Sequence, residues 1–173
     1  MGKSRPAAFL DRDGVINVDR GFVGHPDDFC LVDGAAEAIS LLNRRGYLVF
    51  VVTNQSGIGH GYYTEADFAA LTVHMSSLLA QNNAHIDDLR HCPFHPEAKI
   101  DRYRSVHPWR KPAPGMILDL LNCWEVDVES SFLIGDSVRD VESATAAGID
   151  GYLFGGGNLL QFVKSILSEM GQA

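Results

Sequence analysis

Short apolar segments alternate with amphipathic segments along this chain, and this alternation constrains its fold more than any other feature. Residues 7–10, 47–52 and 131–134 are largely apolar runs of strand length, as strands buried on both faces should be. Segments with helical spacing or capping signals lie between and after them. We therefore predict an α/β chain with a mostly parallel central sheet and helices on both faces. The expected helices are 35–45, 64–79, 114–123, 138–147 and one beginning after Asn158, and the further strands are 86–92 and 151–154.

The chain length and the distribution of prolines predict one domain with one long loop. A length of 173 residues fits a single domain over 1–173, and no linker divides it. Four prolines between residues 93 and 112 exclude long regular structure there. Loops this long in compact domains are usually functional, so we expect 93–112 to set substrate specificity. The spacing between the motifs described below leaves no room for a large separate lid.

Charge and cysteine content restrict the partners. The chain carries 14 Lys and Arg against 22 Asp and Glu, a net charge of −8, which disfavours nucleic acid or an acidic membrane as partner. No apolar stretch is long enough to span a bilayer, and residues 1–6 are too short and polar to begin a signal segment. Three widely spaced cysteines favour a reduced compartment. We expect a cytoplasmic protein that binds a small molecule.

Acidic side chains follow two of the apolar runs. Asp11 and Asp13 come after the first, Asp136 ends the third, and Asp140 lies in the first turn of the next helix. The carboxyl ends of parallel strands meet at one edge, so these side chains should converge. Carboxylates that close together repel and need a cation or a shared proton. Asp11, Asp13 and Asp136 could bind Mg²⁺, although solvated loop acids and acids at a helix N-terminus remain the simpler interpretation of each pair.

Groups suited to an anion follow the second run and lie in the long loop. Thr53, Asn54 and Gln55 would face the acids, and their hydroxyl and amide groups could bind an oxyanion, or simply satisfy a turn. Five of the 14 cations fall within 13 residues, at Lys99, Arg102, Arg104, Arg110 and Lys111. On an acidic chain this clustering suggests an anionic partner, with a solvated basic loop as the alternative.

Taken together, these residues resemble the haloacid dehalogenase-like phosphatase superfamily. The resemblance rests on Asp11-Arg12-Asp13-Gly14, Thr53-Asn54, Lys111, and Gly135-Asp136 with Asp140, in that order. The stretches 9–17, 52–58, 92–93 and 110–112 are similar to the branch of heptose 1,7-bisphosphate 7-phosphatases and histidinol-phosphate phosphatases. The resemblance covers about residues 6–155. It implies a Rossmann-like haloacid dehalogenase fold without a large cap domain.

The resemblance also implies roles for the site residues. Asp11 would attack phosphorus and form an aspartyl phosphate, while Asp13 would act as the general acid and base. Mg²⁺ would be bound by Asp11, Asp136 and the Asp13 carbonyl. Thr53 and Lys111 would stabilise the transferring group, and Asp140 would orient Lys111 or a metal-bound water. Substrate contacts are expected from Asp19, Gly21, Phe22, Asn54, Gln55, Ser56 and Arg110, the last one binding a second anionic group.

The chain departs from the family pattern at two places. A zinc in the family's loop has four ligands that match Cys92, Phe94, His107 and Trp109 here, of which Cys92 alone is retained unchanged. Cys92 and His107, even with His95, would leave an open zinc site, so we expect no zinc. At the second place, Ser137 stands where close relatives often have Lys.

These observations lead to a main functional expectation and two alternatives. The main one is a Mg²⁺-dependent phosphatase that removes the 7-phosphate of D-glycero-D-manno-heptose 1,7-bisphosphate through an aspartyl phosphate. One alternative is histidinol phosphate, or another small sugar phosphate, as substrate. The other is a non-catalytic sugar-phosphate-binding protein, which would not need both a nucleophile and an acid. A monomer is favoured, although no sequence feature fixes the oligomeric state.

Overall fold

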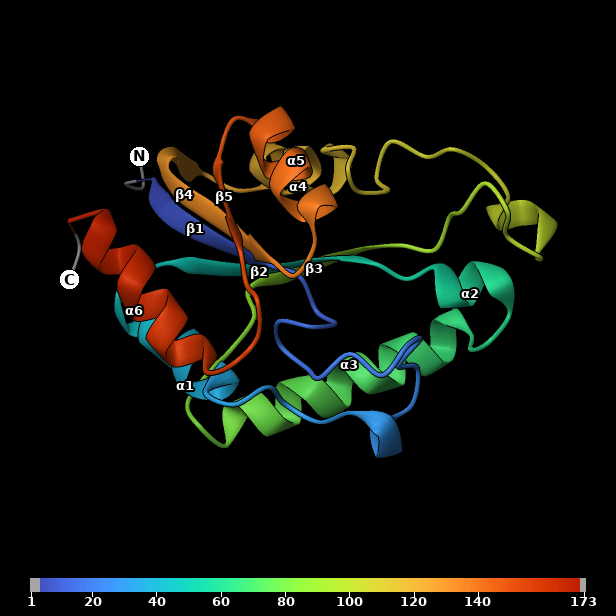
Figure 1. Cartoon of the computed structure of the whole chain (residues 1–173), viewed down its shortest axis with the longest axis horizontal. Helices are drawn as coiled ribbons and strands as arrows, with labels where there is room; N and C mark the ends of the chain where they lie inside the picture. The colour runs from blue at the N-terminus through green and yellow to red at the C-terminus, as the bar shows by residue number, and fades with distance from the viewer. Residues whose placement is uncertain (1–3, 172–173) are drawn as a thin grey trace.

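A computed structural model describes residues 4–171, so the ends of the predicted domain 1–173 and residues 1–3 of the polar first segment lie outside the described residues. The core is a five-stranded sheet (Figure 1). All four strand pairs are parallel, as predicted, and the strand order is β3-β2-β1-β4-β5. The strands are β1 (Arg5–Leu10), β2 (Leu48–Asn54), β3 (Asp88–Cys92), β4 (Val126–Gly135) and β5 (Asp150–Leu153).

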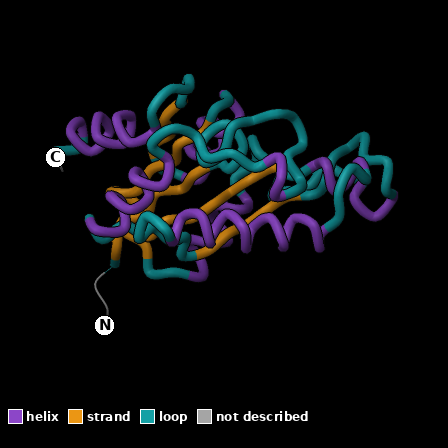
Figure 2. Tube along the Cα trace, turned by 90° about the horizontal axis from the view of Figure 1, so that it is seen from below, coloured by secondary structure: helices purple, strands orange, loops and turns teal. Residues whose placement is uncertain are grey.

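Helices cover both faces of the sheet. Figure 1 shows α1 (Ala35–Arg44), α3 (Glu65–Ala80) and α6 (Leu159–Glu169) on one side and α4 (Gly115–Cys123) and α5 (Val138–Ala147) on the other. The short helix α2 (Ser56–His60) and the segment 93–112 lie at the loop-rich end, at the right of Figures 1 and 2. Among residues 4–171, no helix is both long and apolar enough to cross a membrane.

The inner stretches of β1, β2 and β4 are apolar because each face of the sheet is covered there. Along β1, Ala8 and Leu10 join the core cluster under α1 and α6, whereas Ala7 and Phe9 join the cluster under α4 and α5. Successive side chains of a strand point to opposite faces, so a strand covered on both faces has no polar position. The layered fold thus follows directly from the continuous apolar runs.

Two elements were missed or shortened in the sequence-based prediction. β4 begins at Val126 rather than at residue 131, because its first half carries exposed polar residues such as Glu129 that do not resemble a buried strand. α2 was not predicted, since two glycines in five residues weaken the helical signal. Segment 93–112 contains no strand and one short 3₁₀ helix, Asp101–Tyr103, consistent with its prolines.

Candidate active site

A cavity of about 340 Å³ lies at the carboxyl edge of the sheet. Most of the predicted site residues line it, and they come from β2, α2, α5 and the loops after β1, β2, β3 and β4. Among the described residues, Thr53 and Arg110 are predicted site residues that do not line it. The lining residues are Asp11, Asp13, Asp19, Gly21, Phe22, Asn54, Gln55, Ser56, Tyr63, Lys111, Asp136, Ser137, Arg139 and Asp140.

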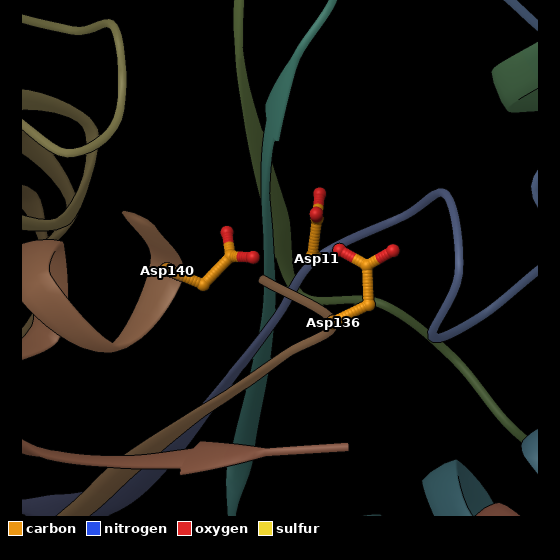
Figure 3. Close-up of side chains that lie close together, drawn as sticks. All are labelled: Asp11, Asp136 and Asp140. Carbon is orange, nitrogen blue, oxygen red and sulfur yellow. The ribbon is translucent and has the colours of Figure 1, made fainter. Parts of the chain in front are cut away.

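Three carboxylates converge in this cavity. Asp11 follows β1, Asp136 follows β4 and Asp140 lies on α5, and one oxygen of each lies within 4.8 Å of the others (Figure 3). Gly14 makes the approach of Asp136 possible. A Cβ atom on Gly14 would lie 2.2 Å from Asp136 Oδ2, and the backbone there has φ +83°. No other residue type fits this turn without moving the carboxylate.

Lys111 carries a buried charge between two of these acids. Its Nζ lies 3.0 Å from Asp11 Oδ1 and 2.5 Å from Asp140 Oδ1, and it also donates to the Val52 carbonyl at 2.8 Å. The side-chain amide of Asn54 forms two hydrogen bonds with the Lys111 backbone. Its Oδ1 accepts from the Lys111 N–H at 3.0 Å, and its Nδ2 donates to the Lys111 carbonyl at 3.1 Å. Asn54 therefore fixes the long loop to the end of β2 at the point where Lys111 enters the cavity.

Asp140 links this lysine to the start of α5. Its Oδ2 accepts hydrogen bonds from the Ser137 N–H at 3.0 Å and from the Ser137 hydroxyl at 2.7 Å. Its side chain is 1% exposed, so its geometry is set by the protein rather than by water. Asp140 thus lies where it can orient Lys111, the role expected from the resemblance.

Burial and mutual repulsion shift the protonation of these groups. Burial raises the pKa of Asp11 to about 7; the Lys111 charge opposes this rise, and the Asp140 charge adds to it. Burial alone would lower the pKa of Lys111, but Asp11 and Asp140 together raise it. Desolvation and then repulsion from Asp140 raise the pKa of Asp136. The acids therefore favour a bound cation, which would stabilise their ionised forms.

The Asp13 carboxylate is enclosed by hydrogen-bond donors. Arg12 Nη2 lies 2.9 Å from Asp13 Oδ1, Asn17 Nδ2 lies 3.0 Å from the same oxygen, and Gln55 Nε2 lies 2.9 Å from Oδ2. Arg12 is 1% exposed and also donates to the Val23 carbonyl at 2.6 Å. No sequence pattern indicates this role for Arg12, because an arginine in a polar turn is normally solvated.

Two further lining residues were not predicted. Tyr63 is buried beside Gln55, and no pattern distinguishes it from an ordinary core tyrosine. Arg139 lies in the first turn of α5. Because β4 ends at Gly135, the turn that follows lies at the same edge of the sheet as the acids. That position could have identified Arg139 as a residue that lines the cavity.

The loop that would hold zinc in the family is occupied by aromatic side chains. The rings of Phe94 and His107 stack with centroids 4.1 Å apart and an interplanar angle of 4°, and Trp109 meets His107 edge-on. Cys92 is buried, and burial raises the pKa of its thiol. Among the described residues, Cys92 and His107 belong to no group of three possible metal ligands. That no zinc binds stays a prediction, and the stack offers another way to order the loop.

Comparisons with known proteins identify the family of this chain. A family model described as "HAD-hyrolase-like" matches residues 108–161. A D-glycero-beta-D-manno-heptose-1,7-bisphosphate 7-phosphatase from Rhodopseudomonas palustris is 51% identical over 98% of this chain and 94% of its own length. This chain belongs to that phosphatase family. It is accordingly a phosphoric monoester hydrolase, and the predicted superfamily is confirmed.

Similar solved structures confirm the Rossmann-like haloacid dehalogenase fold. A D,D-heptose 1,7-bisphosphate phosphatase from B. bronchiseptica, complexed with magnesium and phosphate, aligns with a TM-score of 0.85 at 30% identity, covering 95% of this chain and 99% of that one. A putative HAD-like phosphatase from Mesorhizobium loti aligns with a TM-score of 0.84 at 36% identity, covering 90% of this chain and 75% of that one.

The residues of this family member fit a magnesium ion. Five carboxylates line the cavity, at Asp11, Asp13, Asp19, Asp136 and Asp140, against two cationic side chains, Lys111 and Arg139. Lys111 is already engaged by two acids, and Mg²⁺ prefers carboxylates combined with water and phosphate oxygens. Without a cation, an anionic substrate would meet a strongly acidic cavity.

Proposed function

We propose that this chain is a Mg²⁺-dependent phosphatase that hydrolyses the 7-phosphate of D-glycero-D-manno-heptose 1,7-bisphosphate through an aspartyl phosphate. The observation that carries the proposal is Asp11, a carboxylate that lines the cavity, 3.0 Å from the buried Lys111 charge and next to Asp136. A site for binding alone has no need of a nucleophile in this position. The names of the relatives support the substrate.

The first step is attack by an Asp11 oxygen on the 7-phosphorus. An oxygen–phosphorus bond forms to Asp11, and the bond between phosphorus and the sugar oxygen breaks. Asp13, in its protonated form, gives its proton to the leaving oxygen. Lys111 and Thr53 stabilise the equatorial oxygens of the transferring group.

The second step regenerates the enzyme. Asp13 accepts a proton from water as the water oxygen attacks the phosphorus of the aspartyl phosphate, and the Asp11–phosphorus bond breaks. Asp11, Asp136 and the Asp13 carbonyl would hold Mg²⁺, which would neutralise charge between a carboxylate and a phosphate. Asp140 keeps Lys111 in place through its 2.5 Å contact with Nζ.

Two arginines are candidates for the retained 1-phosphate. Arg139 lines the cavity, and Arg110 lies close enough for repulsion from Arg139 to contribute, after burial, to lowering the pKa of Arg110. Among the described residues, neither forms an ion pair with an acid, and Arg110 donates only to the Phe94 carbonyl, at 3.2 Å. Two cations without acidic partners beside the site favour a second anionic group on the substrate over the cationic amine of histidinol phosphate.

A substrate panel tests the function. With Mg²⁺, phosphate release from the heptose bisphosphate should exceed release from histidinol phosphate and simple sugar phosphates in kcat/KM. Asp11→Asn should abolish turnover, and Asp13→Asn should lower kcat by about 10²-fold or more. Normal turnover by Asp11→Asn would overturn the covalent mechanism, and absence of any phosphate release by the wild type would favour a binding protein.

Arginine variants test the second phosphate. Arg110→Ala and Arg139→Ala should each raise KM for the bisphosphate by about tenfold, because a charge-assisted contact contributes about 1.5 kcal/mol or more. KM for a monophosphate should change less than about twofold. Arg102→Ala, at an exposed position of the 3₁₀ helix in the long loop, is the control and should change neither value. Equal changes for both substrates would remove the arginines from recognition of the second phosphate.

A further inference from the structure

Gln55 connects two groups of the proposed site without facing solvent. It is 1% exposed, and its Nε2 donates to Asp13 Oδ2 and to Thr53 Oγ1, each at 2.9 Å. Its backbone N–H donates to the Cys92 carbonyl at 2.8 Å, which fixes the residue between β2 and β3. Although Gln55 was expected to contact substrate, its side-chain amide is used by protein groups.

The orientation of this amide follows from its partners. Asp13 Oδ2 accepts a hydrogen bond from Gln55 Nε2, so the nitrogen end of this amide faces Asp13. The oxygen end then faces the Tyr63 hydroxyl, 2.5 Å away, and that hydroxyl must be the donor. Burial raises the pKa of Tyr63 to about 12, so the hydroxyl keeps its proton at neutral pH.

The Tyr63 ring is itself fixed by its surroundings. It is 5% exposed and lies against Gly24 in the loop after β1 and Gly57 in α2. A Cβ atom on either glycine would come within 2.3 Å of the ring. The ring therefore fits its position only because both of these residues are glycine. Its hydroxyl has little freedom to turn away from Gln55.

From this chain of contacts we propose that Tyr63 and Gln55 are positioning residues for the acid catalyst. Tyr63 holds the Gln55 oxygen, and the Gln55 nitrogen then holds Asp13 and Thr53 in fixed relation to each other. The inference rests on the proposed function, in which Asp13 gives a proton to the leaving oxygen. Neither positioning residue needs to touch the reacting atoms.

The leaving group provides a readout that a merely structural role would not change. A sugar alkoxide is a strong base and needs a proton as the phosphorus–oxygen bond breaks, whereas 4-nitrophenolate leaves readily without one. Loss of Asp13 positioning should therefore slow phosphoryl transfer from the sugar bisphosphate more than transfer from 4-nitrophenyl phosphate. A general loss of order in the site would slow both substrates alike.

The test compares Tyr63→Phe with the wild type under single-turnover conditions, following release of the leaving group with Mg²⁺ present. We expect about a tenfold slower release from the heptose bisphosphate, a change of less than about twofold for 4-nitrophenyl phosphate, and KM values within about twofold. Tyr62→Phe is the matched control, since Tyr62 is 52% exposed and its ring lies outside the hydrogen-bonded chain. It should behave as the wild type does.

A second variant approaches the same contact from the other side. Gln55→Glu places a carboxylate against Asp13 and should show the same preference for the aryl substrate, so the proposal can be tested even if Tyr63→Phe folds poorly. Equal slowing of both substrates, or no slowing, in the folded variants would overturn the proposal. Asp13→Asn is measured with both substrates as well. If this variant slowed release from both substrates equally, the proposed acid role of Asp13 would be wrong. That result would contradict the proposed function, and it is distinguishable from a failure of the Tyr63 and Gln55 proposal alone.

Discussion

Among single residues, Gly14 bears most directly on how the acids meet. Its substitution can be compared with that of Gly46, because both have nearly the same positive φ, +83° and +84°, but a Cβ on Gly46 would touch nothing within 4 Å. Gly14→Ala and Gly46→Ala should each lose about 1 kcal/mol of unfolding free energy. Gly14→Ala should in addition lose Mg²⁺ affinity and at least about tenfold in kcat/KM, since Asp136 must move.

Calorimetric titration with Mg²⁺ and denaturant unfolding measure these two effects separately. Equal Mg²⁺ affinity in the two variants would show that the close approach of Asp136 to Gly14 does not matter for the site.

The residues that carry the motifs, such as Asp11 and Lys111, could be predicted because charged side chains are unusual directly after a buried strand or clustered in one loop. Arg12 and Tyr63 could not, because their roles arise from burial and from neighbours distant in the sequence.

At the scale of elements, the segment 93–112 depends on packing of its aromatic side chains. The Phe94 ring stacks on His107, and the Phe94 carbonyl accepts from Arg110, the residue before Lys111. Phe94→Ala should therefore lower the unfolding free energy by about 2 kcal/mol and also lower kcat, because Lys111 is held less firmly. Val106→Ala, at a side chain 86% exposed in the same segment, should change neither quantity.

Metal analysis of the purified protein completes this test. If the stack alone orders the segment, a zinc chelator should leave both the melting temperature and kcat unchanged in Mg²⁺ buffer. Stoichiometric zinc whose removal lowers the melting temperature would contradict the aromatic account. The irregular course of this segment was predictable from its prolines, but its packing was not, because stacking partners thirteen residues apart leave no periodic signal.

Elements with a continuous apolar run, or with helical spacing and capping signals, were predicted to within about two residues at each end, whereas the first half of β4 and the short helix α2 were not. β2 is buried on both faces, so its sequence alone identifies it. The first half of β4 pairs with β1 through its backbone while its side chains stay partly exposed, and the pairing shifts register between Pro6 and Ala8. Such a strand depends on its neighbour, which a local pattern does not show.

For the whole molecule, burial of Asp11 in the acidic cavity makes the stability of the fold depend on pH. Asp11 has a folded-state pKa of about 7 against an ordinary value of 3.8, so the folded protein without metal binds a proton more tightly than the unfolded chain does. The stabilisation from this proton is complete below about pH 4 and is lost as the pH rises through about 7. Its full size is at most about 4 kcal/mol.

The prediction is a falling unfolding free energy between pH 4 and pH 8 in metal-free protein, measured by denaturant unfolding with a chelator present. Asp11→Asn removes the titrating group, so this part of the slope should be absent from the variant, whereas carboxyls outside the cavity contribute equally to both proteins. Mg²⁺ at about 100 times its Kd should restore about 2.7 kcal/mol to the wild type at pH 8, because it binds the folded state alone. Identical slopes in wild type and variant would show that Asp11 is not the group whose burial opposes ionisation.

The same repulsion among the carboxylates bears on how an acidic chain can bind an anion. A cation that relieves this repulsion would also neutralise charge beside the phosphate.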